Sequence, residues 1–151
     1  QIIEEAKPSV LQLFGFADAV ENHLERSVRD SDQALDWRLE DLSGGAIDRL
    51  DPKVSIALYR IVQEAVNNAV HHAEAARLVV RLQDTDGVEI VVTDDGRGLG
   101  GKRARRGSGI DNMKTRARLI SARFTAEAGP GGMGTRVTIR LPAEAGRMAA
   151  E

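Results

Sequence analysis

An acidic side chain and an amide side chain stand one helical turn apart near the middle of the chain. Glu64 and Asn68 belong to the run Glu-Ala-Val-Asn-Asn-Ala-Val-His-His at positions 64–72, and residues i and i+4 of a helix share one face. An amide oxygen is a ligand for Mg²⁺, which usually also binds the phosphates of a substrate. Glu64 can hold a metal-bound water or accept a proton. Taken alone, the same run is more typical of the solvated face of an amphipathic helix.

Two glycine-rich turns follow this run. In the first, Asp94 comes directly after a strand-like segment and is followed by Gly96 and Gly98. A carboxylate at a strand end can accept a hydrogen bond from the exocyclic amine of adenine, and glycine lets the backbone pass close to the flat base. In the second, Gly107 and Gly109 precede a helical pattern, and free N–H groups at a helix N-terminus bind phosphate. An ordinary Asp-Gly turn and a flexible lead-in to a helix are the simpler alternatives.

A third glycine cluster precedes the last strand-like segment. Gly132 and Gly134 lead into Thr135, whose hydroxyl can support Asp94 or a water molecule at the base. Between the first two turns, residues 96–109 form a long loop with few apolar anchors, and loops of that length are usually functional. Its basic side chains can meet a phosphate tail or the acidic surface of a partner, although most charge runs are only solvated; they are Lys102, Arg103, Arg105 and Arg106.

The composition argues against several classes of function. The 151 residues carry 21 basic and 23 acidic side chains and no cysteine. This balance does not favour nucleic-acid or membrane contact by the whole domain, and thiolate metal sites and disulfides are excluded. No apolar run reaches the roughly 20 residues that cross a bilayer. We find no P-loop, kinase-type lysine motif or nucleophile elbow. His71 and His72 are adjacent and point to different sides of a helix, so a zinc site is not indicated.

The spacing of apolar residues predicts the elements that position these groups. It indicates one helix from Ser9, as N-cap, to about Val28, and a second after the helix-start signal Asp51-Pro52. The second helix ends near residue 72, and a third is predicted over 110–120. Alternation of apolar and polar residues predicts a hairpin turn at Asp86-Gly87 and five strands, near 35–40, 78–82, 88–92, 124–128 and 137–141. Five strands and three helices favour two layers, a sheet covered on one face.

The length of the chain predicts one domain, which we place at residues 9–142. Residues 1–8 are interpreted as the tail of an upstream helix stopped by Pro8, and residues 143–151 as a frayed C-terminal tail. Because the chain starts at Gln1 in the middle of a pattern, we interpret it as a piece of a longer protein.

Taken in this order, the motifs resemble the catalytic and ATP-binding domain of bacterial sensor histidine kinases, within the gyrase/Hsp90/histidine-kinase/MutL superfamily. The resemblance extends from about Leu35 to Leu141. It places Asn68 at the Mg²⁺ position of the N box, and Asp94, Gly96 and Gly98 in the box that holds adenine. It also places Gly107 and Gly109 in the second glycine box, and Gly132, Gly134 and Thr135 in the last one. It implies the Bergerat fold, a mixed five-stranded sheet with three main helices on one face, and it implies ATP and Mg²⁺ as ligands.

The sequence is most similar to the subfamily that pairs with NarL/LuxR-type response regulators. That subfamily carries a Glu-x-x-x-Asn N box, a short lid and the pattern Gly-x-Gly-Leu-x-x-Met-x-x-Arg-Ala, which residues 107–117 follow closely. One departure concerns His71, because the family often has Lys or Arg there in contact with phosphate. The resemblance therefore leaves that contact to His71 or to a basic residue of the lid, residues 96–106.

The resemblance also implies partners and a reaction. The phosphoacceptor histidine of such kinases lies on an upstream dimerisation domain, through which the response regulator is reached. We therefore expect this chain to bind nucleotide without phosphorylating itself, to be largely monomeric, and to be cytoplasmic whether or not the parent protein is membrane-anchored. The alternatives are an anti-sigma-factor-type Ser/Thr kinase, a non-catalytic nucleotide-gated interaction module, and an ATPase of the chaperone or topoisomerase kind.

Overall fold

Five strands form one mixed sheet in the computed structural model, which describes residues 9–98 and 109–142. The strands are β1 (Asp36–Leu42), β2 (Arg77–Asp84), β3 (Val88–Asp94), β4 (Arg123–Ala128) and β5 (Thr135–Arg140). Their order across the sheet is β1-β2-β3-β5-β4, and only β1 and β2 run parallel. The register places Val80 opposite Val92 and Leu82 opposite Ile90. All four side chains are buried, so the alternating pattern marks the inner face of the sheet.

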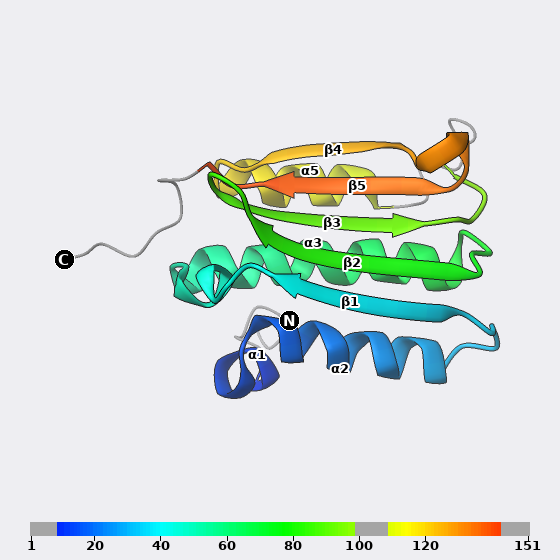
Figure 1. The fold of residues 1–151 in the computed structure, drawn as a ribbon, viewed down its shortest axis with the longest axis horizontal. Coiled ribbons are helices and arrows are strands. Elements are labelled where there is room, and N and C mark those ends of the chain that lie inside the picture. The colour runs from blue at the N-terminus through cyan, green and yellow to red at the C-terminus, as the bar shows by residue number, and fades with distance from the viewer. Residues whose placement is uncertain (1–8, 99–108, 143–151) are drawn as a thin grey trace.

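Three helices supply the second layer: α2 (Phe16–Arg29), α3 (Pro52–His71) and α5 (Ile110–Leu119). In Figure 1, α3 and α5 lie behind the sheet and α2 runs beside β1. The central helix α3 contacts α2 on one side and α5 on the other. It begins where expected, because the Asp51 carboxylate accepts a hydrogen bond from the Lys53 N–H at 2.8 Å and Pro52 occupies the first turn. The predicted fold, five mixed strands with three main helices on one face, is confirmed.

The prediction of one helix from Ser9 to Val28 is wrong. The chain forms a short helix α1 (Ser9–Phe14), turns at Gly15 with φ +98°, and continues as α2. Asp48, in the 3-10 helix η2 (Ala46–Arg49), accepts a hydrogen bond from the Phe16 N–H at 2.9 Å. This distant carboxylate satisfies one of the free N–H groups at the start of α2. Apolar spacing carries no information about such a cap, since its two partners are 32 residues apart.

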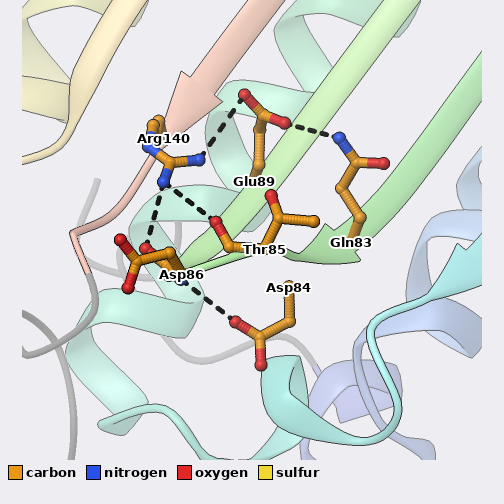
Figure 2. A network of polar contacts seen from close by, with 7 residues as sticks. Gln83, Asp84, Thr85, Asp86, Glu89 and Arg140 are labelled. Atoms are coloured by element: carbon orange, nitrogen blue, oxygen red, sulfur yellow. Dashed lines mark hydrogen bonds and ion pairs between the residues drawn. The ribbon is translucent and has the colours of Figure 1, made fainter.

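The hairpin of β2 and β3 turns at Asp86 and Gly87, as predicted, both with positive φ. Figure 2 shows how this end of the sheet is held together. The Arg140 guanidinium donates to the backbone oxygens of Thr85 and Asp86, at 2.9 and 3.0 Å, and Asp84 accepts from the Gly87 N–H at 3.2 Å. This end lies opposite the end of β3 at which the candidate site residues gather.

Other expectations fall outside the described residues, namely those on residues 1–8, most of the long loop and residues 143–151. Over residues 9–98 and 109–142, none of the helices has the length and apolar character that crossing a membrane would require.

Candidate functional site

Several chain segments meet at one end of the strands, and we use the word edge for this end of the sheet. β3 ends at Asp94, β5 begins at Thr135, and the register pairs these two residues. The C-terminal end of α3 and the N-terminal end of α5 lie at the same edge, on the right in Figure 1. The fold therefore brings residues from both layers of the domain to one place.

Asp94 is the buried acid of this edge. Its exposure is 8%, and one carboxylate oxygen accepts the Gly96 N–H at 2.8 Å. Burial raises the pKa of Asp94, and the neighbouring Asp95 adds to that shift, while hydrogen bonds from the backbone N–H groups of Gly96 and Thr135 oppose it. The backbone thus fixes a poorly hydrated carboxyl group at the strand end, where it can accept a hydrogen bond from a ligand.

The next residue, Asp95, has a different role. It is exposed, and its side chain accepts the N–H groups of Ala76 and Arg77 at 2.8 and 2.9 Å. The hydrogen bond from Arg77 is the largest of the causes that lower the pKa of Asp95. Asp95 therefore fastens this loop to the start of β2, while Asp94 keeps the geometry of a ligand acceptor. No sequence signal distinguishes the structural role of Asp95 from that of its neighbour.

The glycines of this edge allow backbone segments to approach one another. A Cβ on Gly96 would lie 2.2 Å from the carbonyl oxygen of Ala73, just beyond α3, and one on Gly134 would lie 1.8 Å from that of Asp94. Gly98, with φ +82°, would place a Cβ 3.0 Å from the oxygen of Gly134. Real Cβ atoms do not make the first two contacts, so a side chain at either position requires a backbone shift. The sequence predicted that Gly96 and Gly98 let the backbone approach a ligand, and the close approach that the structure describes is to the protein's own backbone.

Glu64 and Asn68 lie on the part of α3 that faces this edge. A Cβ on Gly109 would lie 2.1 Å from Oε2 of Glu64, so the Glu64 side chain rests against the residue that precedes α5. Asn68, one turn further along, is half-buried, and its carbonyl oxygen accepts the His72 N–H at 3.0 Å. His71 is exposed in the last turn of α3. Gly107 and the basic loop residues lie outside the described residues.

The helix α3 connects the two halves of the edge. Glu64 contacts Gly109, and Ala73, nine residues later, contacts Gly96 and accepts the Arg97 N–H at 2.7 Å. Asn68 lies between these contacts. At 1.5 Å per residue, Glu64 lies about 10 Å along the helix from its last residue, His71, and Ala73 lies just beyond that end. Most of the predicted site residues thus lie on the second half of α3, at the adjoining ends of β3 and β5, or at the start of α5. They are Glu64, Asn68, His71, Asp94, Gly96, Gly98, Gly109 and Thr135.

A divalent cation at this edge would find oxygen ligands. The amide of Asn68 and the carboxylate of Glu64 share one side of α3, and both oxygen types suit Mg²⁺. No group of three His, Cys, Asp or Glu side chains suited to a metal is found within residues 9–98 and 109–142. The side chains present therefore fit a cation that takes its remaining ligands from phosphates and water.

The mixed sheet, the single helix layer and this edge define the class of the protein, an α/β nucleotide-binding domain. Residues 53–145 match the histidine kinase-, DNA gyrase B- and HSP90-like ATPase family, and the chain belongs to that family. Among relatives, an uncharacterized sensor-like histidine kinase from Chloroflexus aurantiacus is 36% identical over 93% of this chain and 24% of its own length. The histidine-protein kinase/phosphatase DegS of Bacillus subtilis is 34% identical over 62% of this chain and 26% of its own length.

A solved structure agrees on the fold. The ATP-binding domain of PrrB from Mycobacterium tuberculosis superposes with a TM-score of 0.62 at 24% identity, covering 83% of this chain and 92% of that one. The chain spans about a quarter of the length of the curated relatives it matches. It is an ATP-binding domain of the kind that histidine kinases carry, as the motifs predicted.

Proposed function

We propose that this domain binds Mg²⁺–ATP along α3 and donates the γ-phosphate to a histidine on a dimerisation domain of its parent protein. The single observation that carries the proposal is that Glu64 of α3 contacts Gly109 while Ala73, just beyond the end of α3, contacts the loop after Asp94, with Asn68 between them. One extended nucleotide can therefore reach the buried carboxylate with its base and the start of α5 with its phosphates. The names of the relatives from Chloroflexus aurantiacus and Bacillus subtilis, both histidine kinases, support the choice of acceptor.

Each residue has a role that its surroundings support. Asp94 accepts a hydrogen bond from the adenine amine, and Thr135 supports that carboxylate through its backbone N–H. Asn68 holds Mg²⁺ across the phosphates, and Glu64 orients a metal-bound water. Backbone N–H groups at the start of α5, beside Gly109, attract the phosphate tail. Gly107 and the lid over residues 96–106 complete the cradle in this proposal. When bound, the metal neutralises phosphate charge, and phosphoryl transfer otherwise depends mainly on positioning.

The second glycine box supports a finer assignment, to kinases that pair with NarL/LuxR-type response regulators. Its helical part runs from Gly109 through Met113 to Ala117, and both Met113 and Ala117 are buried. The apolar positions of the motif therefore anchor α5 in the core, while its N-terminus points at the site edge. In this proposal the regulator is reached through the dimerisation domain, the domain itself is a cytoplasmic monomer, and it contacts neither nucleic acid nor membrane.

The contact with the β- or γ-phosphate falls to His71 or to a basic lid residue. His71 is exposed in the last turn of α3, where it can reach a phosphate. Arg97 is a poor substitute, because its guanidinium donates to the carbonyl oxygen of His72. The remaining candidates are Lys102, Arg103, Arg105 and Arg106.

The test is calorimetric titration of the domain with ATP, with Mg²⁺ and with EDTA, on the wild type and on Asn68→Ala. We expect Mg²⁺ to increase the ATP affinity of the wild type, and the variant to lose that increase while its affinity in EDTA stays the same. A Mg²⁺ effect that survives in Asn68→Ala would refute the metal assignment. Adding a dimerisation segment of the parent protein should then give a phosphorylated product, whereas the domain alone should not label itself.

The stability of that product separates the alternatives. A phosphohistidine is lost in acid, so acid-stable label would point to the Ser/Thr kinase reading instead. Binding of ATP without any transfer to the dimerisation segment would favour a nucleotide-gated interaction module.

A further inference from the structure

Arg97 connects the loop of Asp94 to the last turn of α3, and neither the fold nor the proposed chemistry assigns it a role. It stands between Gly96 and Gly98, and its side chain is 63% exposed. Its backbone N–H donates to the Ala73 oxygen at 2.7 Å. The guanidinium turns to the same end of α3, where Nε donates to the His72 oxygen at 3.1 Å and Nη2 donates to it as well.

The guanidinium contact falls on the carbonyl group of His72, the C-cap residue of α3. The last four carbonyl groups of a helix have no partner within it, and a cation near them also interacts favourably with the helix dipole. The ion pair of Arg97 with Glu74 is long, at 3.9 Å, and its two side chains are 63% and 71% exposed. Such a pair contributes little, so the contact with His72 is the one that matters.

The contact with His72 continues to the metal ligand. The His72 N–H donates to the carbonyl oxygen of Asn68 at 3.0 Å, so two hydrogen bonds in series join Arg97 to Asn68. His71 lies in the same turn. On the other side, Arg97 is three residues from Asp94, and between them the backbone of Gly96 packs closely against the carbonyl group of Ala73.

We propose that Arg97 is a positioning residue that fixes the distance between the base acceptor Asp94 and the metal ligand Asn68. The inference rests on the proposed function, because it assigns those two residues to opposite ends of one nucleotide. Arg97 itself touches neither the base nor the phosphates. Without it, the last turn of α3 frays, and Asn68 and His71 lose their alignment with a base that is still bound at Asp94.

The test compares Arg97→Ala and Arg97→Lys with the wild type. Arg81→Ala is the matched control, because Arg81 is also half-exposed and bonds Glu40 at 2.9 Å on the open face of the sheet. Calorimetry measures the factor by which Mg²⁺ increases the affinity for ATP, and the affinity for adenosine, which has no phosphates. Loss of the two guanidinium hydrogen bonds to the His72 oxygen, which share one exposed acceptor, predicts a drop of about fivefold in the Mg²⁺ factor for Arg97→Ala, with adenosine affinity unchanged. Arg97→Lys should recover part of the loss, and Arg81→Ala should match the wild type.

Hydrogen exchange gives a second measurement without any nucleotide. The His72 amide should exchange faster in Arg97→Ala than in the wild type, because its hydrogen bond to the Asn68 carbonyl oxygen opens more often when the last turn of α3 is less stable. An unchanged Mg²⁺ factor, an equal loss of adenosine and ATP affinity, or unchanged exchange at His72 would each overturn the inference. A wild type that shows no Mg²⁺-dependent ATP binding would instead refute the proposed function, whatever the exchange result.

Discussion

Replacing Asp94 by Asn tests the base site with the smallest change in shape. The carboxylate accepts the N–H groups of Gly96 and Thr135 and, in the proposed function, the adenine amine as well. An amide has only one oxygen, so its NH₂ group would face at least one of these donors. The variant should therefore keep its fold and lose the contact with adenine.

The size of the loss follows from the kind of hydrogen bond. A hydrogen bond to a charged acceptor contributes about 1.5–3 kcal/mol, which corresponds to about a 10- to 150-fold weaker ATP affinity. Folding should suffer little, because burial already raises the pKa of Asp94 and thus opposes its ionised form. Removing that charge offsets the lost backbone contact, and we expect a melting temperature within about 3 °C of the wild type.

Calorimetry with ATP and a thermal melt are sufficient measurements. Asp84→Asn is the matched control, because Asp84 also accepts a glycine N–H, that of Gly87 at 3.2 Å, but at the opposite end of β3. Asp84→Asn should bind ATP as the wild type does. An Asp94→Asn domain that keeps full ATP affinity would refute the role of this carboxylate, and one that unfolds would refute the balance of burial and hydrogen bonding described above.

Three further predictions follow from the same structure. Gly134→Ala should destabilise the domain by about 2–5 kcal/mol in urea unfolding, since its Cβ would lie 1.8 Å from the backbone carbonyl oxygen of Asp94. Gly131→Ala is the control, because Gly131 also has a positive φ of +70° but its Cβ would meet no atom within 4 Å; it should cost only about 1–2 kcal/mol. Equal losses of stability in the two variants would contradict the packing argument. Asp48→Ala should cost about 1–2 kcal/mol through the cap of α2 without changing ATP affinity, so weaker ATP binding would contradict its assignment. Hydrogen bonds lower the pKa of Asp95, so the contribution of its carboxylate to the free energy of unfolding should be complete at neutral pH and lost as the pH falls through that lowered pKa. A stability difference between Asp95→Asn and the wild type that persists in strong acid would argue against this.

Most of the fold was predictable because each element carries a local signal. Strict alternation marked the strands, and an acidic cap followed by proline marked the start of α3. The break at Gly15 had no such signal, because it depends on Asp48 from a distant segment. A pattern that repeats every three or four residues continues across one glycine unless a tertiary contact stops it.

The site was predictable only in part, for the same reason. Residue types and their order indicated Asn68 and Asp94, but they could not show that Asp95 fastens β2 or that Arg97 reaches the end of α3. Both roles depend on side chains that cross between segments 18 to 25 residues apart. Gly96 and Gly98 were predicted to let the backbone approach a base, and in the structure the atoms nearest to their Cβ positions are backbone atoms of Ala73 and Gly134.

The central claim is that α3, the loop after Asp94 and the start of α5 bind one adenine nucleotide together. A nuclear magnetic resonance titration of the ¹⁵N-labelled domain with Mg²⁺–ATP tests it directly, with Mg²⁺–GTP as the comparison because guanine has a carbonyl oxygen in place of the adenine amine. We predict that the amides of Asn68, Gly96 and Gly109 shift along one common binding curve with ATP, and that GTP binds far more weakly. Shifts confined to one of the three segments, or equal curves for ATP and GTP, would contradict the account.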